Sequence, residues 1–266
     1  MVSRSQEEPI MENKKAHIKT NSKEVMPIME IFGPTIQGEG MVVGQKTIFL
    51  RTGGCDYHCS WCDSAFTWDG STEPTYMTPE EAYDKVIDLS LNEKGESICN
   101  HMTLTGGNPA LVNEPMARLL EMLKAAGFKI SIETQGTIYR EWFKLIDHFV
   151  LSPKPPSSKM RTNMRLLDRI VAQLIEDEVN FTFKIVIFDD EDLAYAKELF
   201  KHYPEAPKPY YLSVGNIDAL EQGDVSGRLI QKLGWLWDKV FEDPELNDAR
   251  PLPQLHTLVY SNKRGV

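Results

Sequence analysis

Short apolar runs alternate with amphipathic helical stretches from Pro27 onward, and this alternation is what most constrains the fold. Runs rich in β-branched and aromatic residues predict strands at 28–32, 46–52, 101–105, 128–133, 148–152, 181–188 and 210–214. Most of them are separated by helical patterns at 78–89, 113–126, 140–146, 163–176, 190–202 and 223–240. Such alternation predicts parallel β/α units, arranged as an open doubly wound sheet or as a barrel.

The helix boundaries and the domain limits follow from local signals. Thr78-Pro79-Glu80-Glu81 is a capping box with proline at the first helical position, and Gly127 is a helix stop. No Gly/Ser/Pro linker divides the chain, so we expect one domain over residues 26–266. Residues 1–25 are polar and without sustained periodicity, which predicts a disordered extension.

The composition excludes several classes of protein. The chain is 41% hydrophobic and 26% charged, as in ordinary globular proteins, and it has neither a run of roughly 18 apolar residues nor a secretory h-region. We therefore expect a cytoplasmic protein without a membrane partner. The net charge is -10, which argues against a nucleic-acid surface and means that any anionic ligand must be met by local positive charge.

Residues suited to chemistry follow five of the predicted strands directly. Parallel strands place their carboxyl ends at one edge, where active-site loops meet in barrels and open sheets alike. The sequence therefore predicts one composite site at this edge. The residues are Cys55, Gly106-Gly107, Thr134-Gln135-Gly136, Pro153-Lys154 and Gly215-Asn216.

Three of the four cysteines form a C-x3-C-x2-C motif, Cys55, Cys59 and Cys62. A structural zinc site needs four ligands, generally as two separated pairs, and no second pair follows. A 4Fe–4S cluster held by three thiolates keeps one iron open for another ligand. Zinc binding and a purely electron-transferring cluster remain as alternatives. Cys99, alone before a strand, is expected to act as a small hydrophobic residue.

The motif, with Trp61 directly before its last cysteine, resembles the radical S-adenosylmethionine (SAM) superfamily, in which SAM binds the open iron. The next β/α loop reads Thr105-Gly106-Gly107-Asn108-Pro109. Members of the superfamily commonly carry GGEP there, close to the SAM amino group, and glycine permits such a close backbone approach. Asn108 stands in the glutamate position, which leaves any carboxylate role there in doubt.

Further motifs extend the resemblance from about Met29 to Val266. They are EIFGPTIQGEG, the arginine four residues before Cys55, CDSAFTW, ETQGT, SPKPPSSK and QLHTLVYSNKRGV. Together they are similar to the 7-carboxy-7-deazaguanine synthase family. The resemblance implies an incomplete (β/α) barrel of the radical SAM type, with about six core parallel strands. It implies a radical SAM lyase that converts 6-carboxy-5,6,7,8-tetrahydropterin to 7-carboxy-7-deazaguanine with release of ammonia, on the route to queuosine and other 7-deazapurines.

The substrate residues are expected on several loops. The glycine-flanked Gln37 to Glu39 can read the polar edge of a pterin, and Arg51 can pair with its carboxylate. The resemblance adds a Mg2+ ion on Ser64, where other members have threonine; an Asp63 carboxylate or simple loop capping is the competing account. The full expected substrate set is Ile36, Gln37, Gly38, Glu39, Arg51, Thr105, His256 and Val266.

The resemblance also implies a set of SAM contacts, drawn from the loops that follow successive strands. These are Gly106, Gly107, Glu133, Gln135, Ser152, Pro153, Lys154, Ser213, Val214, Gly215 and Asn216.

The expected partners are a flavodoxin- or ferredoxin-type reductant and a second copy of the chain. The homodimer is implied by the resemblance and is weakly indicated by Trp235 and Trp237 in the last long helical pattern. Two other functions stay open on the sequence: an activase that places a glycyl radical on a protein partner, and a non-enzymatic iron–sulfur or zinc module.

Overall fold

The computed structural model describes residues 24–216, 218 and 223–265. Its strands form one sheet in the order β3-β1-β2-β4-β5-β6-β7-β8-β9. The strands are β1 (Met26–Ile36), β2 (Lys46–Thr52), β3 (Thr75–Met77), β4 (His101–Gly106), β5 (Lys129–Thr134), β6 (His148–Leu151), β7 (Phe181–Ile187), β8 (Tyr210–Val214) and β9 (Ala249–Leu252).

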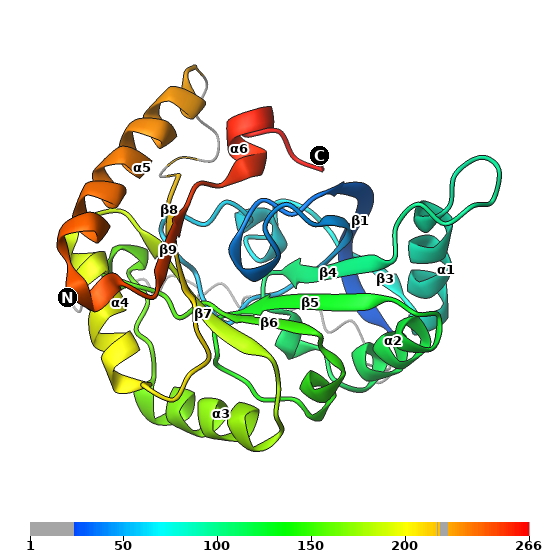
Figure 1. The fold of residues 1–266 in the computed structure, drawn as a ribbon. Coiled ribbons are helices and arrows are strands. Elements are labelled where there is room, and N and C mark those ends of the chain that lie inside the picture. The colour runs from blue at the N-terminus through cyan, green and yellow to red at the C-terminus, as the bar shows by residue number, and fades with distance from the viewer. Residues whose placement is uncertain (1–23, 217, 219–222, 266) are drawn as a thin grey trace, which may run out of the picture.

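The helices lie outside the curved sheet, as Figure 1 shows for α1 to α5. They are α1 (Pro79–Ser90), α2 (Glu114–Ala125), α3 (Met164–Glu176), α4 (Asp190–His202), α5 (Val225–Glu242) and α6 (Leu255–Tyr260). Short 3-10 helices are η1 (Gly40–Val42), η2 (Ala65–Thr67), η3 (Pro109–Leu111), η4 (Glu141–Leu145), η5 (Pro156–Ser158) and η6 (Pro244–Leu246).

The sheet is an incomplete barrel, as expected from the sequence. Strands β2 and β4 to β9 pair in parallel, whereas β1 and β3 add an antiparallel edge. In the described parts of the chain the two edge strands, β3 and β9, do not pair with each other. The hollow side of the sheet holds η1, because a Cβ on Gly40 would contact Val150 of β6 and Lys184 of β7.

Three sequence predictions about elements need correction. Among the described residues the parallel strands number seven rather than about six, because the sequence pattern does not predict β9; its Pro251 is tolerated on an edge strand. The first strand extends to Ile36, beyond the predicted 28–32. The pattern at 140–146 forms the 3-10 helix η4 instead of an α-helix.

Other local predictions are confirmed. Thr78 Oγ1 accepts the Glu81 N–H at 3.2 Å and Glu81 Oε2 accepts the Thr78 N–H at 2.8 Å, which completes the capping box of α1. Gly127 follows α2 with φ +83°, a left-handed conformation suited to glycine. Cys99 is buried in the hydrophobic core. The predicted extension falls mainly on residues 1–23, which lie outside the described residues, as does Val266.

Burial between sheet and helices makes the site rigid. All seven residues of β7 are buried, and the helices contribute one apolar face each, such as Leu167, Ile170, Val171 and Leu174 of α3. The continuous core holds the strand ends in place, so the loops that follow them are presented from a fixed frame. Within the described residues, no helix is both long enough and apolar enough to span a membrane.

Candidate active site

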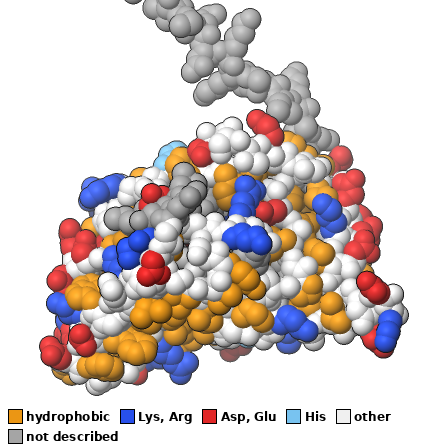
Figure 2. All heavy atoms as spheres, turned by 90° about the horizontal axis from the view of Figure 1, so that it is seen from above, with side chains coloured by type: hydrophobic (Ala, Val, Ile, Leu, Met, Phe, Trp, Pro, Cys, Tyr) orange, Lys and Arg blue, Asp and Glu red, His pale blue; other side chains and the backbone are white. Residues whose placement is uncertain are grey.

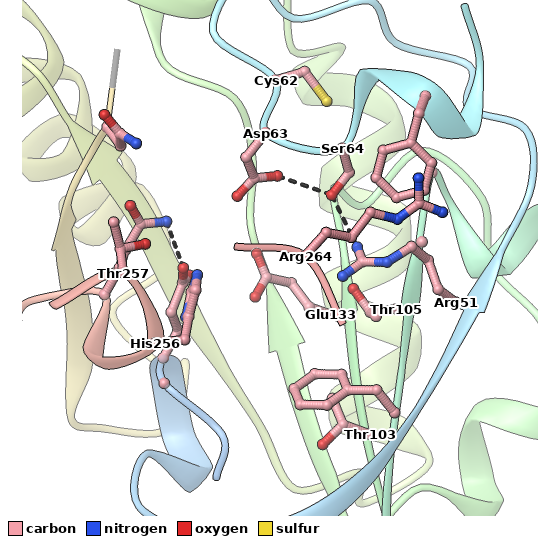
Figure 3. A pocket seen from close by; sticks show the side chains of 18 of the residues that line it. Arg51, Cys62, Asp63, Ser64, Thr103, Thr105, Glu133, His256, Thr257 and Arg264 are labelled. Carbon is pink, nitrogen blue, oxygen red and sulfur yellow. Dashed lines mark hydrogen bonds between the residues drawn. The ribbon is translucent and has the colours of Figure 1, made fainter. Parts of the chain in front are cut away.

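A cavity of about 550 Å³ opens at the carboxyl ends of the parallel strands (Figure 3). Each of the five loops singled out in the sequence contributes to its wall. Seventeen expected site residues line it together: Ile36, Gln37, Gly38, Glu39, Arg51, Cys55, Cys59, Cys62, Ser64, Thr105, Gly106, Gly107, Glu133, Gln135, Lys154, Asn216 and His256.

The loop after β2 carries the three thiols and is fastened to the loop after β6. Ser60 donates its N–H to Ser158 O at 3.0 Å, and Trp61 donates its indole N–H to Ser157 Oγ at 3.0 Å. The Trp61 ring also packs against Phe188, with ring centroids 5.1 Å apart. The aromatic residue before the last cysteine therefore has a structural role, which is to hold the cysteine loop against its neighbour.

The thiols fit a 4Fe–4S cluster. All three line the same cavity, and burial raises their pKa, that of Cys59 to about 11. Within the described residues, no three His, Cys, Asp or Glu side chains gather closely enough for a single metal ion. A 4Fe–4S cluster carries each thiolate on a different iron, so its ligands need not meet at one point. The cavity continues beyond the thiols, as an iron that takes an exogenous ligand requires.

Asn108 has a role that the sequence did not reveal. It is fully buried; its amide donates to Asp56 Oδ1 at 2.8 Å, and its carbonyl oxygen accepts from Thr134 Oγ1 at 2.8 Å. Gln135 donates to the same Asp56 oxygen at 2.5 Å and lies 3.7 Å from Cys55 Sγ. An amide can donate and accept at once, which a carboxylate cannot. Asn108 thus joins three site loops, those after β2, β4 and β5.

The glycines of this loop are required by packing against the cysteine loop. A Cβ on Gly107 would lie 1.9 Å from Gly54 O, and one on Gly106, at φ +141°, would lie 2.4 Å from Thr52 O. A side chain at either position would push the loop after β4 away from the end of β2. The close approach that calls for glycine is therefore backbone to backbone within the protein.

A buried triad of charges forms one wall. The Lys184 ammonium, only 3% exposed, pairs with Glu39 and lies 2.8 Å from Glu133. Burial opposes ionisation of Glu39, but Lys184 and His256 outweigh it and lower its pKa to about 2. Burial likewise disfavours the Lys184 ammonium, and Glu133 and Glu39 raise its pKa above the usual value. Glu39 therefore stays ionised at neutral pH, and it and Glu133 offer carboxylate oxygens as acceptors for N–H groups of a ligand.

The start of α6 closes this wall. Gln254 donates to Glu39 Oε1 at 2.6 Å, and Leu255 donates its N–H to Gly38 O at 3.1 Å. A Cβ on Gly38 would lie 2.4 Å from His256 Nδ1, so glycine is needed there for the imidazole to pack. The segment from Gly38 to Glu39 is thus held from the far end of the chain.

The opposite wall carries arginine side chains paired with carboxylates. Arg51 donates from Nε to Glu30 Oε1 at 2.8 Å and from a terminal nitrogen to Ser64 Oγ at 2.8 Å, and Ser64 donates to Asp63 Oδ1 at 2.9 Å. Figure 3 shows Arg264 beside this group. A Mg2+ ion on Ser64 could also bind the Asp63 carboxylate. The hydrogen bond from Arg51 to Ser64 Oγ would then have to break, so that this oxygen could bind the ion.

Five of the residues predicted to contact SAM do not line the cavity. Ser152, Pro153, Ser213, Val214 and Gly215 are not among the described residues that line the cavity. Ser152 Oγ accepts from Lys154 Nζ at 3.2 Å and so supports a lining residue. Gly215 packs on Phe188, whose ring would lie 2.1 Å from an added Cβ. Val266 lies outside the described residues.

Sequence reasoning missed Lys184, Glu30, Gln254 and Arg264 as parts of the site. Lys184 had a detectable signal, because it is the sole charged residue of the otherwise apolar and Thr-containing run Phe181 to Phe188. Glu30, Gln254 and Arg264 lay in motifs already quoted, but nothing in their spacing shows that they meet other site residues across the barrel.

Known proteins share both the motifs and the fold. The family model described as the radical SAM superfamily matches residues 49–153. The 7-carboxy-7-deazaguanine synthase of Bacillus subtilis (strain 168) is 51% identical over 247 residues, covering 91% of this chain and 98% of the relative. That of Bacillus cereus is 48% identical over 245 residues, covering 91% and 99%.

The chain belongs to the 7-carboxy-7-deazaguanine synthase family. This membership confirms the predicted radical SAM enzyme, and with it a 4Fe–4S cluster and SAM as cofactors. The crystal structure of QueE from Escherichia coli has a TM-score of 0.57 at 22% identity, covering 86% of this chain and 94% of that one. The structure of anSMEcpe with bound AdoMet has a TM-score of 0.53 at 21% identity, covering 80% and 63%. Both likenesses confirm the fold.

Proposed function

We propose that this member of the 7-carboxy-7-deazaguanine synthase family converts 6-carboxy-5,6,7,8-tetrahydropterin to 7-carboxy-7-deazaguanine with release of ammonia. The observation that carries the proposal is that one cavity holds three thiols, two carboxylates beside the buried Lys184, and an arginine on the opposite wall. Such a cavity suits a small polar ligand with N–H donors at one end and a carboxylate at the other.

We propose that Cys55, Cys59 and Cys62 hold the 4Fe–4S cluster, which together with SAM supplies the radical that starts the reaction. The glycine loop after β4 and the lining residues of the next loops, Glu133, Gln135, Lys154 and Asn216, border the space left for SAM. Behind these loops, Ser152 accepts from Lys154 and Gly215 packs on Phe188. Of the three cysteines, Cys59 is buried and Cys55 and Cys62 are half-buried.

The substrate is oriented by the two charged walls. Glu39, kept ionised by Lys184, accepts N–H groups of the pterin, while Gln37 and His256 border the same end. At the other end the substrate carboxylate lies near Arg51, Thr105 and Ser64. We propose a Mg2+ ion at Ser64 and Asp63, because hydroxyl and carboxylate oxygens are its usual ligands. In that state Arg51 releases Ser64 and pairs with the substrate.

Anaerobic reconstitution tests the proposal. The protein, loaded with iron and sulfide, is incubated with SAM, a low-potential reductant, Mg2+ and 6-carboxytetrahydropterin, and the products are identified by mass spectrometry. We expect 7-carboxy-7-deazaguanine. Cleavage of SAM without this product would contradict the substrate assignment, and a requirement for a protein substrate would favour the activase.

A matched pair of cysteine variants tests the cluster ligands. Cys55→Ala is expected to lose turnover and one thiolate ligand, which lowers the iron content, whereas Cys99→Ala, a buried thiol outside the cavity, keeps both. Turnover by Cys55→Ala would contradict the ligand assignment. Iron content and visible absorbance report on the ligands independently of activity.

We also propose a homodimer, a flavodoxin- or ferredoxin-type reductant, one domain over 26–266 and a cytoplasmic location. The dimer is supported by apolar side chains of α5 that reach solvent, Ile230, Trp237 and Phe241, of which Phe241 is 77% exposed. On the face shown in Figure 2, basic and acidic side chains are interspersed with apolar groups. Light scattering of the full chain measures the mass, and a monomer at micromolar concentration would contradict the dimer.

A further inference from the structure

Two guanidinium groups meet in the cavity although they come from opposite ends of the chain. Arg51 lies on β2, and Arg264 lies in the C-terminal tail, here residues 261–265, which follows α6. Glu30 of β1 joins them, accepting the Nε–H of Arg51 at 2.8 Å and that of Arg264 at 3.1 Å. Figure 3 shows both groups beside Ser64.

The geometry leaves the outer nitrogens of both arginines available. Glu30 accepts the Nε–H of each arginine, and Arg51 donates one terminal N–H to Ser64. Among the described residues, no hydrogen-bond acceptor contacts the terminal nitrogens of Arg264. The Arg264 guanidinium carbon lies 3.4 Å from the centroid of the Phe66 ring. Stacking on an aromatic face fixes the guanidinium and leaves its edges free to donate.

The charge balance of the wall without a bound cation favours Arg264 as a partner for an anionic ligand. The ionisable groups joined by hydrogen bonds at this wall are Arg51, Arg264, Glu30 and, through Ser64, Asp63. With both arginines the wall is neutral, and with Arg51 alone the two carboxylates would make it negative. Before a cation binds at Ser64 and Asp63, a carboxylate entering beside Arg51 alone would therefore meet net repulsion, which Arg264 removes. With a Mg2+ ion there, Arg264 would add a second guanidinium that can donate to the carboxylate.

We propose that Arg51 and Arg264 together form the receptor for the ligand's carboxylate, with Glu30 as the residue that positions both guanidiniums. The inference rests on the proposed function, whose substrate and product both carry a carboxylate on a bicyclic ring. It makes the C-terminal tail a part of the binding site and assigns selectivity for the carboxylate to a pair of arginines.

A comparison of two ligands separates recognition of the carboxylate from a general effect on the cavity. The reconstituted enzyme with SAM is titrated anaerobically with 7-carboxy-7-deazaguanine and with 7-deazaguanine, which lacks the carboxylate, by equilibrium dialysis. We expect Arg264→Met to weaken the carboxylated ligand about 10- to 100-fold, the usual range for charge-assisted hydrogen bonds. We expect binding of 7-deazaguanine to change less than twofold. Arg264→Lys keeps the positive charge but loses the two parallel N–H donors of the guanidinium, so its affinity for the carboxylated ligand should lie between those of the wild type and Arg264→Met.

The matched control is Arg118→Met, an exposed arginine of α2 paired with Glu80 and remote from the cavity; both affinities should stay at the wild-type level. Glu30→Gln removes a negative charge but also the acceptor that positions both guanidiniums, so the positioning role predicts selectively weaker binding of the carboxylated ligand. Unchanged or tighter binding of that ligand would overturn the positioning role of Glu30. An equal loss of both ligands in Arg264→Met would show that the arginine only fastens the tail, which overturns the receptor and leaves the proposed function standing. Failure of the wild-type enzyme to bind either ligand would overturn both.

Discussion

At the scale of single residues, Lys184 carries a buried charge that two carboxylates depend on. Its ammonium is 3% exposed between Glu39 and Glu133. Removing one member of a buried ionic group leaves the others uncompensated, which costs about 3–5 kcal/mol. We therefore expect Lys184→Met to lower the free energy of unfolding by about this amount, measured by urea denaturation. Lys208→Met, exposed and paired with Asp248, should lie within about 0.5 kcal/mol of wild type.

A second substitution tests the reason for that loss. If uncompensated carboxylates cause it, Lys184→Met combined with Glu133→Gln should recover part of the stability, because one of the two carboxylates left without the lysine loses its charge. A double variant as unstable as the sum of its single changes would show that packing of the lysine stem, rather than its charge, is what Lys184 supplies.

His101 should give the protein a stability that depends on pH. Burial, and next the nearby His148, lower the pKa of His101 to about 4 from its usual 6.5. Its ring contacts Thr47 Oγ1 at 2.8 Å and Ser131 Oγ at 2.7 Å. Below pH 6.5 the unfolded chain takes up a proton that the folded chain refuses until about pH 4, so the free energy of unfolding falls through this window.

The measurement is urea denaturation between pH 7 and pH 4 for the wild type and for His101→Gln, which carries no titrating ring. The variant is expected to be less stable at pH 7 but to lose less stability on acidification. Parallel pH curves for the two proteins would contradict the assignment to His101.

At the scale of elements, the turn between β4 and η3 determines where the cysteine loop lies. A Cβ on Gly107 would lie 1.9 Å from the Gly54 carbonyl oxygen, and backbone cannot yield as a flexible side chain does. We expect Gly107→Ala to separate the two loops and to reduce the iron bound after reconstitution, with a loss of about 1–3 kcal/mol in stability. Iron content per protein is the readout.

The α5 helix supplies the control. Gly234 lies within it, and a Cβ there would meet open space. Gly234→Ala should leave the iron content unchanged and stabilise the helix by about 0.5–1 kcal/mol. Full iron loading of Gly107→Ala would show that the loop can shift without disturbing the thiols.

The elements that the sequence predicts well are those with a local physical cause. The capping box at Thr78 and the glycine stop at 127 involve neighbouring residues, and both are found as expected. β9 has no such signal, since Pro251 disfavours a strand unless the strand lies at an edge, which is a property of the whole sheet.

The same distinction explains which site residues were found. The five loops after strand ends were predictable because parallel strands share an edge. The contact between Asn108 and Asp56, or between Gln254 and Glu39, depends on side-chain directions across the barrel and has no periodic trace in the sequence. Motif spacing could identify the residues of the site but not the hydrogen bonds among them.

At the scale of the whole molecule, the C-terminal segment from Gln254 onward contacts residues near the gap between the two edges of the open sheet. The edge strands β3 and β9 are unpaired with each other among the described residues. Across this opening, Gln254 contacts Glu39, Asn262 accepts from Asn216 at 2.7 Å, and Arg264 contacts Glu30. A segment that makes polar contacts at the rim of the cavity, and adds little to the hydrophobic core, should matter more for ligand binding than for folding.

Truncation separates these two contributions. Removal of residues 262–266 deletes the Asn262 and Arg264 contacts but none of the core residues, so we expect a free energy of unfolding within about 1 kcal/mol of wild type. Affinity for 7-carboxy-7-deazaguanine should fall at least about tenfold, because the loss includes a charge-assisted hydrogen-bond donor.

Removal from residue 254 onward also takes Leu258, which packs on the core, and Gln254, which contacts the buried Glu39. That longer deletion should lower stability as well as affinity. If the short deletion unfolded the protein, the tail would be part of the barrel itself; if it bound the ligand as tightly as the full chain, the site would be complete without the tail.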